Sequence, residues 1–211
     1  QMNVKKRLID FVREKNIKKS LFTAGPASLA AENLLGLGPC FGRNDLEYLK
    51  VERKVLNKLK NISGHKKTVY MQGSGSLALE AVSLNFLYGK VLIISTGYYS
   101  DRLFSLCIKA QRNLKKIVQV SKINWNDLED FSGKYDWVWA CPIETSCGLK
   151  IPIPELRKFS KKIKAKLALD ATASIGLESF HELGDVISYS SCKGLFGLSG
   201  ACFISYNINP E

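Results

Sequence analysis

Residues 166–200 read KLALDATASIGLESFHELGDVISYSSCKGLFGLSG, and this stretch decides the fold. Its two short apolar runs, at 166–170 and 185–189, are typical of buried strands. The first run ends in a carboxylate, Asp170, and the second leads into a loop of small residues with a single lysine, Lys193. Because ligands of open α/β sheets bind outside the carboxyl ends of the strands, we expect both side chains at one rim of a sheet.

Short apolar runs alternate with helical periods on both sides of this stretch. We expect further strands at 68–71, 90–95, 116–120, 136–140 and 201–206, and helices at 75–88, at about 99–111, near 125–131 and at 154–164. This alternation is typical of βαβ units, so it favours a three-layer α/β domain over residues 66–211 with a mainly parallel sheet and helices on both faces.

Residues 1–65 follow a different pattern. Helices are expected at about 3–15 and 44–60, on either side of a turn-rich segment (23–29) and a Gly-rich segment (34–43). We interpret residues 1–65 as an amino-terminal arm that packs on the α/β domain, or on a partner subunit, and forms one structural unit with the domain.

The composition narrows the class of protein. The chain has 211 residues, 45% of them hydrophobic, which is enough for one sizeable core. Its 31 Lys and Arg against 19 Asp and Glu give a net charge of +12. The basic pairs are scattered and accompany no aromatic stripe, so we do not expect nucleic-acid binding. No segment has the roughly 18 apolar residues of a membrane span, and the basic first 20 residues lack the apolar core of a secretory signal.

The six cysteines have no CxxC spacing, so neither a disulfide framework nor a metal site is expected. Reduced cysteines are typical of cytosolic proteins, and we therefore expect a cytoplasmic location.

Several residues follow the ends of expected strands, and each allows two interpretations. The segment from Gln72 to Ser76, QGSGS, could bind a phosphate at a helix N-terminus or form a tight turn with a serine cap. Asp170 could pair with a cationic ligand nitrogen or cap the next turn. Lys193 could form a Schiff base or reach solvent. Tyr98 or Tyr99 could lie over a planar ligand or pack in the core.

Taken together, a phosphate cradle, an aromatic plate, a strand-end carboxylate and a loop lysine at one rim are the parts that hold pyridoxal phosphate. His65 and His181 lie in polar stretches without ligand partners nearby in the sequence, so we assign no role to them.

Four motifs carry a resemblance to a known family. They are LFTAGPASL (21–29), MQGSGSLALEA (71–81), IETSCGLKIPI (143–153), and LALDATASIGL with SYSSCKGLFGLSG (167–200). In this order they resemble the class V, fold-type-I pyridoxal-phosphate aminotransferases. The nearest branch is that of 2-aminoethylphosphonate–pyruvate transaminase and the alanine and serine–glyoxylate aminotransferases. The resemblance runs from about residue 21 to 206 and implies the large domain of that fold.

The resemblance also implies roles for individual residues. Lys193 would form the Schiff base and move the substrate proton, and Asp170 would hold the pyridine nitrogen protonated. The other residues would bind the phosphate (Ser74, Gly75, Ser76), stack on the ring (Tyr99), bond near the ring hydroxyl (Thr145) and line the substrate pocket (Gly25, Arg43). No residue is expected to bind a metal. A homodimer is expected, because relatives build each site from two subunits.

The chain departs from the family pattern at several points. Cys192 precedes the lysine where relatives often carry a better hydrogen-bonding residue, Ser199 stands where they often have proline, and Cys147 occupies the fourth position of the ETSTG-type motif. Relatives continue into a C-terminal small domain, which we expect to be absent here through fragmentation or natural truncation.

The function implied is transfer of an amino group from a small donor, of the 2-aminoethylphosphonate, alanine or serine type, to a 2-oxo acid such as pyruvate or glyoxylate. One alternative is a class V lyase or cysteine desulfurase, and Cys192 and Cys147 keep it open. Another is a truncated, non-catalytic binding module.

Overall fold

A seven-stranded mixed sheet forms the centre of the protein. The computed structural model describes residues 4–18, 25–26, 30–36, 42 and 44–210. The strand order is β1-β9-β8-β7-β4-β2-β3. The strands span Lys67–Gln72 (β1), Gly89–Ser95 (β2), Ile117–Asn124 (β3), Trp137–Ala140 (β4), Lys166–Asp170 (β7), Val186–Ser190 (β8) and Ala201–Tyr206 (β9).

Strand β9 runs antiparallel to both of its neighbours, and all other pairs in this sheet are parallel. The six remaining strands therefore share one direction. As expected, β1, β2, β4, β7 and β8 end at the same side of the sheet, which we call the rim.

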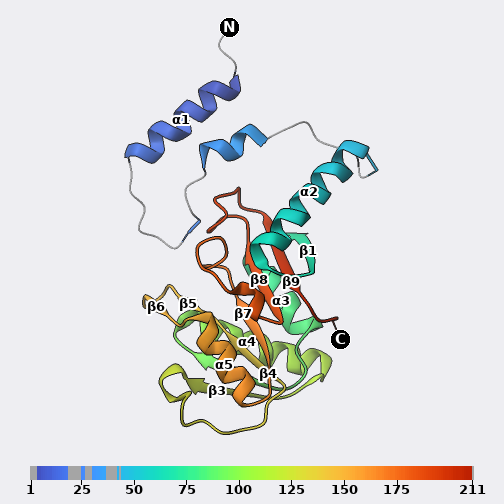
Figure 1. The fold of residues 1–211 in the computed structure, drawn as a ribbon, viewed down its shortest axis with the longest axis vertical. Helices are drawn as coiled ribbons and strands as arrows, with labels where there is room; N and C mark the ends of the chain where they lie inside the picture. Colours follow the sequence, from blue (N-terminus) through green and yellow to red (C-terminus); the bar gives the residue numbers. More distant parts are fainter. Residues whose placement is uncertain (1–3, 19–24, 27–29, 37–41, 43, 211) are drawn as a thin grey trace.

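Three long helices cover the two faces of the sheet (Figure 1). Helices α3 (Gly75–Asn85) and α4 (Tyr98–Leu114) pack on one face, and α5 (Ile153–Lys162) packs on the other. Alternate side chains of strand β2 enter different apolar clusters on the two faces of the sheet. Val91 and Ile93 join the α3 and α4 cluster, whereas Leu92 and Ile94 join the α5 cluster, because successive side chains of a strand point to opposite faces. The three-layer architecture is thus confirmed.

The amino-terminal part contains helix α1 (Val4–Lys18), a 3₁₀ helix η1 (Ala31–Gly36) and helix α2 (Leu46–Ser63). Figure 1 shows these elements extending from one end of the sheet domain. Ile9, Ala31 and Leu34 form a small buried cluster of their own. Helix α2 is capped by the Asp45 side chain, and it ends at Gly64 in the left-handed conformation.

Two expectations about secondary structure were wrong. The helix expected near 125–131 is only a 3₁₀ turn, η2 (Trp125–Asp127), because seven residues make too few helical hydrogen bonds to offset the cost of nucleation. The loop expected after β4 contains a small hairpin, β5 (Ile143–Glu144) and β6 (Leu149–Lys150). Two-residue strands are too short to show a periodicity in the sequence.

The two histidines are buried, in contrast to the polar loops expected for them. His65 Nε2 lies 2.8 Å from the Gly184 carbonyl oxygen, and His181 Nε2 lies 2.9 Å from Ser174 Oγ. Both lie at or beside the 3₁₀ helix η3 (His181–Leu183). His65 joins the end of α2 to the sheet domain, whereas His181 bonds within that domain. Within the described parts of the chain, no helix combines the length and the apolar character that crossing a bilayer requires.

Candidate cofactor site

A cavity of about 200 Å³ lies at the rim, and residues from five segments that follow strands line it. Seven of the residues singled out from the sequence are among them, namely Ser74, Gly75, Ser76, Tyr99, Thr145, Asp170 and Lys193. The shared direction of the strands brings these residues together, although they are far apart in the chain. Among the described residues, no group of three His, Cys, Asp or Glu side chains could hold a metal ion.

One wall of the cavity is the N-terminus of α3. Ser74 is the N-cap residue but its side chain makes no capping hydrogen bond, so the serine-cap interpretation does not hold. A Cβ atom on Gly75 would lie 3.3 Å from Thr172 Oγ1 and 3.5 Å from Ser190 Cβ. The first turn of α3 is therefore pressed closely against the segments that follow β7 and β8. Its backbone N–H groups and the helix dipole favour an anion here.

Asp170 is a buried carboxylate without an ion-pair partner among the described residues. Its side chain is held by the Thr172 backbone N–H, 3.0 Å from Oδ1. Burial raises the pKa of Asp170, while the neighbouring Thr172 and the charge of Arg102 oppose this shift. An ionised carboxylate in this position lacks a close cation, and a cationic ring nitrogen would supply one.

Lys193 lies against the amino-terminal part of the chain. A Cβ atom on Gly25 would come within 2.8 Å of Lys193 Nζ, and the φ of +136° at Gly25 also favours glycine. The lysine loop is held further by the Phe196 carbonyl oxygen, which accepts hydrogen bonds from the Ala30 N–H and from the Asn33 side chain. Gly25 thus lies beside the lysine, but it is not among the residues that line the cavity, so its role in the substrate pocket stays a prediction. Arg43 lies outside the described residues, and its role in that pocket stays a prediction too.

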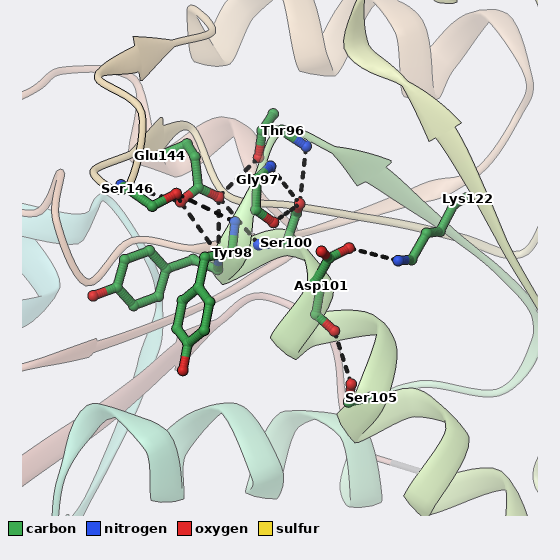
Figure 2. A network of polar contacts seen from close by, with 10 residues as sticks. Thr96, Gly97, Tyr98, Ser100, Asp101, Ser105, Lys122, Glu144 and Ser146 are labelled. Atoms are coloured by element: carbon green, nitrogen blue, oxygen red, sulfur yellow. Dashed lines mark hydrogen bonds and ion pairs between the residues drawn. The ribbon is translucent and has the colours of Figure 1, made fainter.

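Tyr99, and not its neighbour, lines the cavity. Tyr98 is 69% exposed, and the two rings meet edge to face with their centroids 5.3 Å apart. The Tyr99 backbone N–H donates to the buried Glu144 carboxylate, at 3.1 Å from Oε2 (Figure 2). Thr145, which follows Glu144, lines the same cavity.

The sequence interpretation missed other residues that line the cavity. They are Leu79, Arg102, Cys141, Ile143, Thr172, Ala173 and Ser190; Cys192, noted above for its position, lines it too. Arg102 follows Tyr99 by three residues on α4, a spacing that places both on one helix face and could have identified it. Thr172 follows Asp170 by two residues. Its hydroxyl is buried and has no hydrogen-bond partner in the described structure.

No family model matches the chain. Curated relatives do match it. An uncharacterized aminotransferase from Methanocaldococcus jannaschii is 27% identical over 183 residues, which is 78% of this chain and 46% of the relative. A 2-aminoethylphosphonate–pyruvate transaminase from Pseudomonas aeruginosa is 26% identical over 197 residues, covering 87% of this chain and 53% of the relative. The chain therefore spans about half the length of the curated relatives it matches.

Solved structures share the fold. The ureidoglycine–glyoxylate aminotransferase of Bacillus subtilis has a TM-score of 0.75 at 21% identity, over 88% of this chain and 51% of that one. The pyridoxamine–pyruvate aminotransferase of Mesorhizobium loti has a TM-score of 0.77 at 21% identity, over 88% of this chain and 50% of that one. The sheet and its helices thus form the large domain of fold type I, and the resemblance to the class V aminotransferases that the four motifs indicate is confirmed.

Proposed function

We propose that this chain binds pyridoxal phosphate and belongs to an aminotransferase that moves an amino group from a small donor to a 2-oxo acid. One observation carries the proposal: a single cavity joins Lys193, the buried Asp170 and the N-terminus of α3. A site for this cofactor needs an amine, an acid for the ring nitrogen and an anion cradle. The names of the aminotransferase relatives support the same activity.

The unsatisfied groups of the cavity fit this cofactor. Asp170 lacks a cation, the Thr172 hydroxyl lacks a partner, and the first turn of α3 has no capping side chain. When bound, pyridoxal phosphate supplies an aldehyde that reacts reversibly with amines and a ring that accepts electrons. Asp170 would accept a hydrogen bond from the ring nitrogen and keep it protonated. Ser74, Gly75 and Ser76 would hold the phosphate.

Lys193 would hold the cofactor covalently and carry the substrate proton. A lysine in these roles must be neutral for part of the cycle. Gly25 leaves room beside Nζ, so the amine can move between the ring and the substrate. Tyr99 would cover the ring, and Thr145 would bond near its hydroxyl.

The substrates we propose are a donor of the 2-aminoethylphosphonate, alanine or serine type and an acceptor such as pyruvate or glyoxylate. Several relatives are named 2-aminoethylphosphonate–pyruvate transaminases, which favours that donor. Gly25 and Arg43 are the residues that we assign to the substrate pocket.

We also propose a homodimer. Three exposed apolar side chains lie on one face of helix α2, which we call the α2 surface; they are Val51, Val55 and Ile62. A second copy of the chain would cover it, because contiguous apolar patches on soluble proteins mark interaction sites. We retain the division into an arm (1–65) and an α/β domain (66–211), supported by the separate apolar cluster of α1 and η1. A cytoplasmic location is proposed from the cysteine pattern alone.

The test is reduction of the purified chain with borohydride in the presence of pyridoxal phosphate. Wild-type protein and Lys150→Ala should both retain one covalently bound cofactor, identified by peptide mass at Lys193. Lys150 is the matched control, because its ammonium group pairs with Glu178. Lys193→Ala should retain none. Labelling of several surface lysines to the same extent as Lys193 would contradict the proposal.

A desulfurase-type reaction is the second candidate, since Cys192 lines the cavity beside Lys193. A cysteine desulfurase from Thermococcus onnurineus shares the fold with a TM-score of 0.63 at 18% identity. No histidine is among the residues that line the cavity, and both histidines bond elsewhere. Incubation with cysteine decides between the two: a persulfide on Cys192 would favour the desulfurase, and its absence together with exchange of amino groups would favour the transaminase.

A further inference from the structure

We propose that Glu144 is the positioning residue of the cofactor cavity, because it substitutes for a missing N-cap side chain and so fixes Tyr99 and Thr145. The inference rests on the proposed function for its link to pyridoxal phosphate. Glu144 itself lies beside the cavity lining, and its side chain is completely buried.

Helix α4 has an unusual N-terminus. Its N-cap residue is Gly97, which has no side chain to accept a hydrogen bond from the first turn. The Ser100 hydroxyl is already engaged, since it accepts from the N–H groups of Thr96 and Gly97 and donates to the Gly97 carbonyl. The N–H groups of Tyr99 and Ser100 therefore need an acceptor from another part of the chain.

Glu144 of β5 provides this acceptor. Its Oε2 accepts hydrogen bonds from the Tyr99 N–H at 3.1 Å, the Ser100 N–H at 3.2 Å and the Thr96 hydroxyl at 3.2 Å. Figure 2 shows the carboxylate directed at the first turn of α4. The positive end of the helix dipole favours a negative charge at this point. The carboxylate thus acts as a cap that belongs to a distant segment of the chain.

Gly97 makes this arrangement possible. A Cβ atom there would lie 2.9 Å from Glu144 Cγ and 3.0 Å from Glu144 Cδ. A larger N-cap residue would displace the carboxylate. Gly97 therefore leaves the space at the start of α4 that the Glu144 carboxylate occupies.

The same carboxylate also holds the opposite wall of the cavity. Its Oε1 accepts hydrogen bonds from the Ser146 N–H at 3.3 Å and from the Ser146 hydroxyl. Thr145 lies between Glu144 and Ser146 in the chain, so these contacts fix its position on both sides. One buried group thus sets the distance between the start of α4, which carries Tyr99, and the hairpin, which carries Thr145.

The test compares Glu144→Gln with Asp101→Asn. Both changes neutralise a carboxylate near the first turn of α4, but Asp101 is exposed and pairs with Lys122 (Figure 2). In the cofactor-free protein, amide hydrogen exchange at Tyr99 and Ser100 should accelerate about tenfold in Glu144→Gln and remain unchanged in Asp101→Asn. Affinity for pyridoxal phosphate, followed by absorbance, should fall about tenfold only in Glu144→Gln.

A double-mutant cycle separates positioning from general loss of stability. In a Tyr99→Leu background, Glu144→Gln should weaken cofactor affinity by less than about twofold, because the ring that it positions is gone. If Glu144→Gln does not fold, Thr96→Val, which removes one donor to the same carboxylate, should show the exchange effect in weaker form. Unchanged exchange, or full additivity in the cycle, would overturn the inference. If the wild type binds no pyridoxal phosphate, the proposed function fails, and the exchange comparison alone decides the role of Glu144.

Discussion

The cavity at the rim and the α2 surface are both incomplete, but in opposite ways. The cavity buries the Asp170 carboxylate, which has no ion-pair partner among the described residues, and the Thr172 hydroxyl, which has no hydrogen-bond partner there. The α2 surface exposes apolar side chains that a folded chain usually buries, and Val51 is 48% exposed. A buried polar group without a partner costs free energy, and so does an exposed apolar patch.

This difference indicates what each region needs. Buried charge and hydroxyl groups are satisfied by a small polar ligand, whereas an apolar helix face is satisfied by another apolar surface. Three other buried polar groups, the indole N–H groups of Trp137 and Trp139 and the Ser188 hydroxyl, also lack a partner among the described residues, but none of them lines the cavity. The cavity and the α2 surface are the two regions that we assign to cofactor binding and to subunit contact.

The largest effect is expected for Asp170→Asn. Affinity for pyridoxal phosphate should fall about 100-fold, because truncating one partner of a buried charge pair costs about 2–3 kcal/mol. The free energy of unfolding of the cofactor-free protein should stay constant or rise, because a buried charge without a partner is removed. Absorbance titration and urea unfolding measure the two quantities, with Asp101→Asn as the control. A loss of stability equal to the loss of affinity would show that Asp170 serves the fold and not the ligand.

The next largest effect concerns the α2 surface. The double variant Val51→Glu with Val55→Glu should weaken self-association about 30-fold, since it removes apolar contacts worth about 1 kcal/mol each and adds like charges on both copies. Sedimentation at several protein concentrations measures this. Val118→Glu is the control, because Val118 is 70% exposed on β3, the strand at the opposite edge of the sheet from β1. If the wild type is a monomer at all concentrations, the proposal that a second copy covers the α2 surface is wrong.

A smaller effect is expected for Thr172→Val. This change keeps the shape of the side chain and removes its unpartnered hydroxyl. Cofactor affinity should fall about fivefold, within the range for one hydrogen bond, while the cofactor-free protein becomes slightly more stable. Titration and thermal unfolding of the same samples give both values. Equal affinity of the two proteins would mean that the hydroxyl does not bind the ligand.

The smallest effect is a pH dependence of the free energy of unfolding, which arises from the two buried histidines, His65 and His181. Burial lowers the pKa of His65 and of His181 below the value of about 6.5 in the unfolded chain. The unfolded state then binds more protons than the native state as the pH falls through 6.5, so the free energy of unfolding should decrease from pH 7.5 to 5.5. Urea unfolding at these pH values measures the slope. The slope should be shallower in His65→Gln, and a slope that is unchanged would exclude a contribution from His65.

The sequence by itself determined the sheet and the identity of seven of the fifteen residues that line the cavity. Short apolar runs such as KVLIIS and KLALD are local signals, and residues that follow parallel strands necessarily meet at one rim. Lys193 and Asp170 were therefore found without coordinates. The two-residue strands β5 and β6 were not, because a pattern needs more residues than they contain.

Only the tertiary structure decided which groups are satisfied. From the sequence alone, Glu144 is an ordinary loop residue and His65 belongs to a polar turn, although both side chains are buried in the structure. Their roles come from N–H and carbonyl groups that lie 44 and 119 residues away in the chain. Hydrogen bonds between such distant residues depend on three-dimensional approach and leave no periodic trace in the sequence. The same reason hid the buried hydroxyl of Thr172, which lines the cavity and has no hydrogen-bond partner among the described residues.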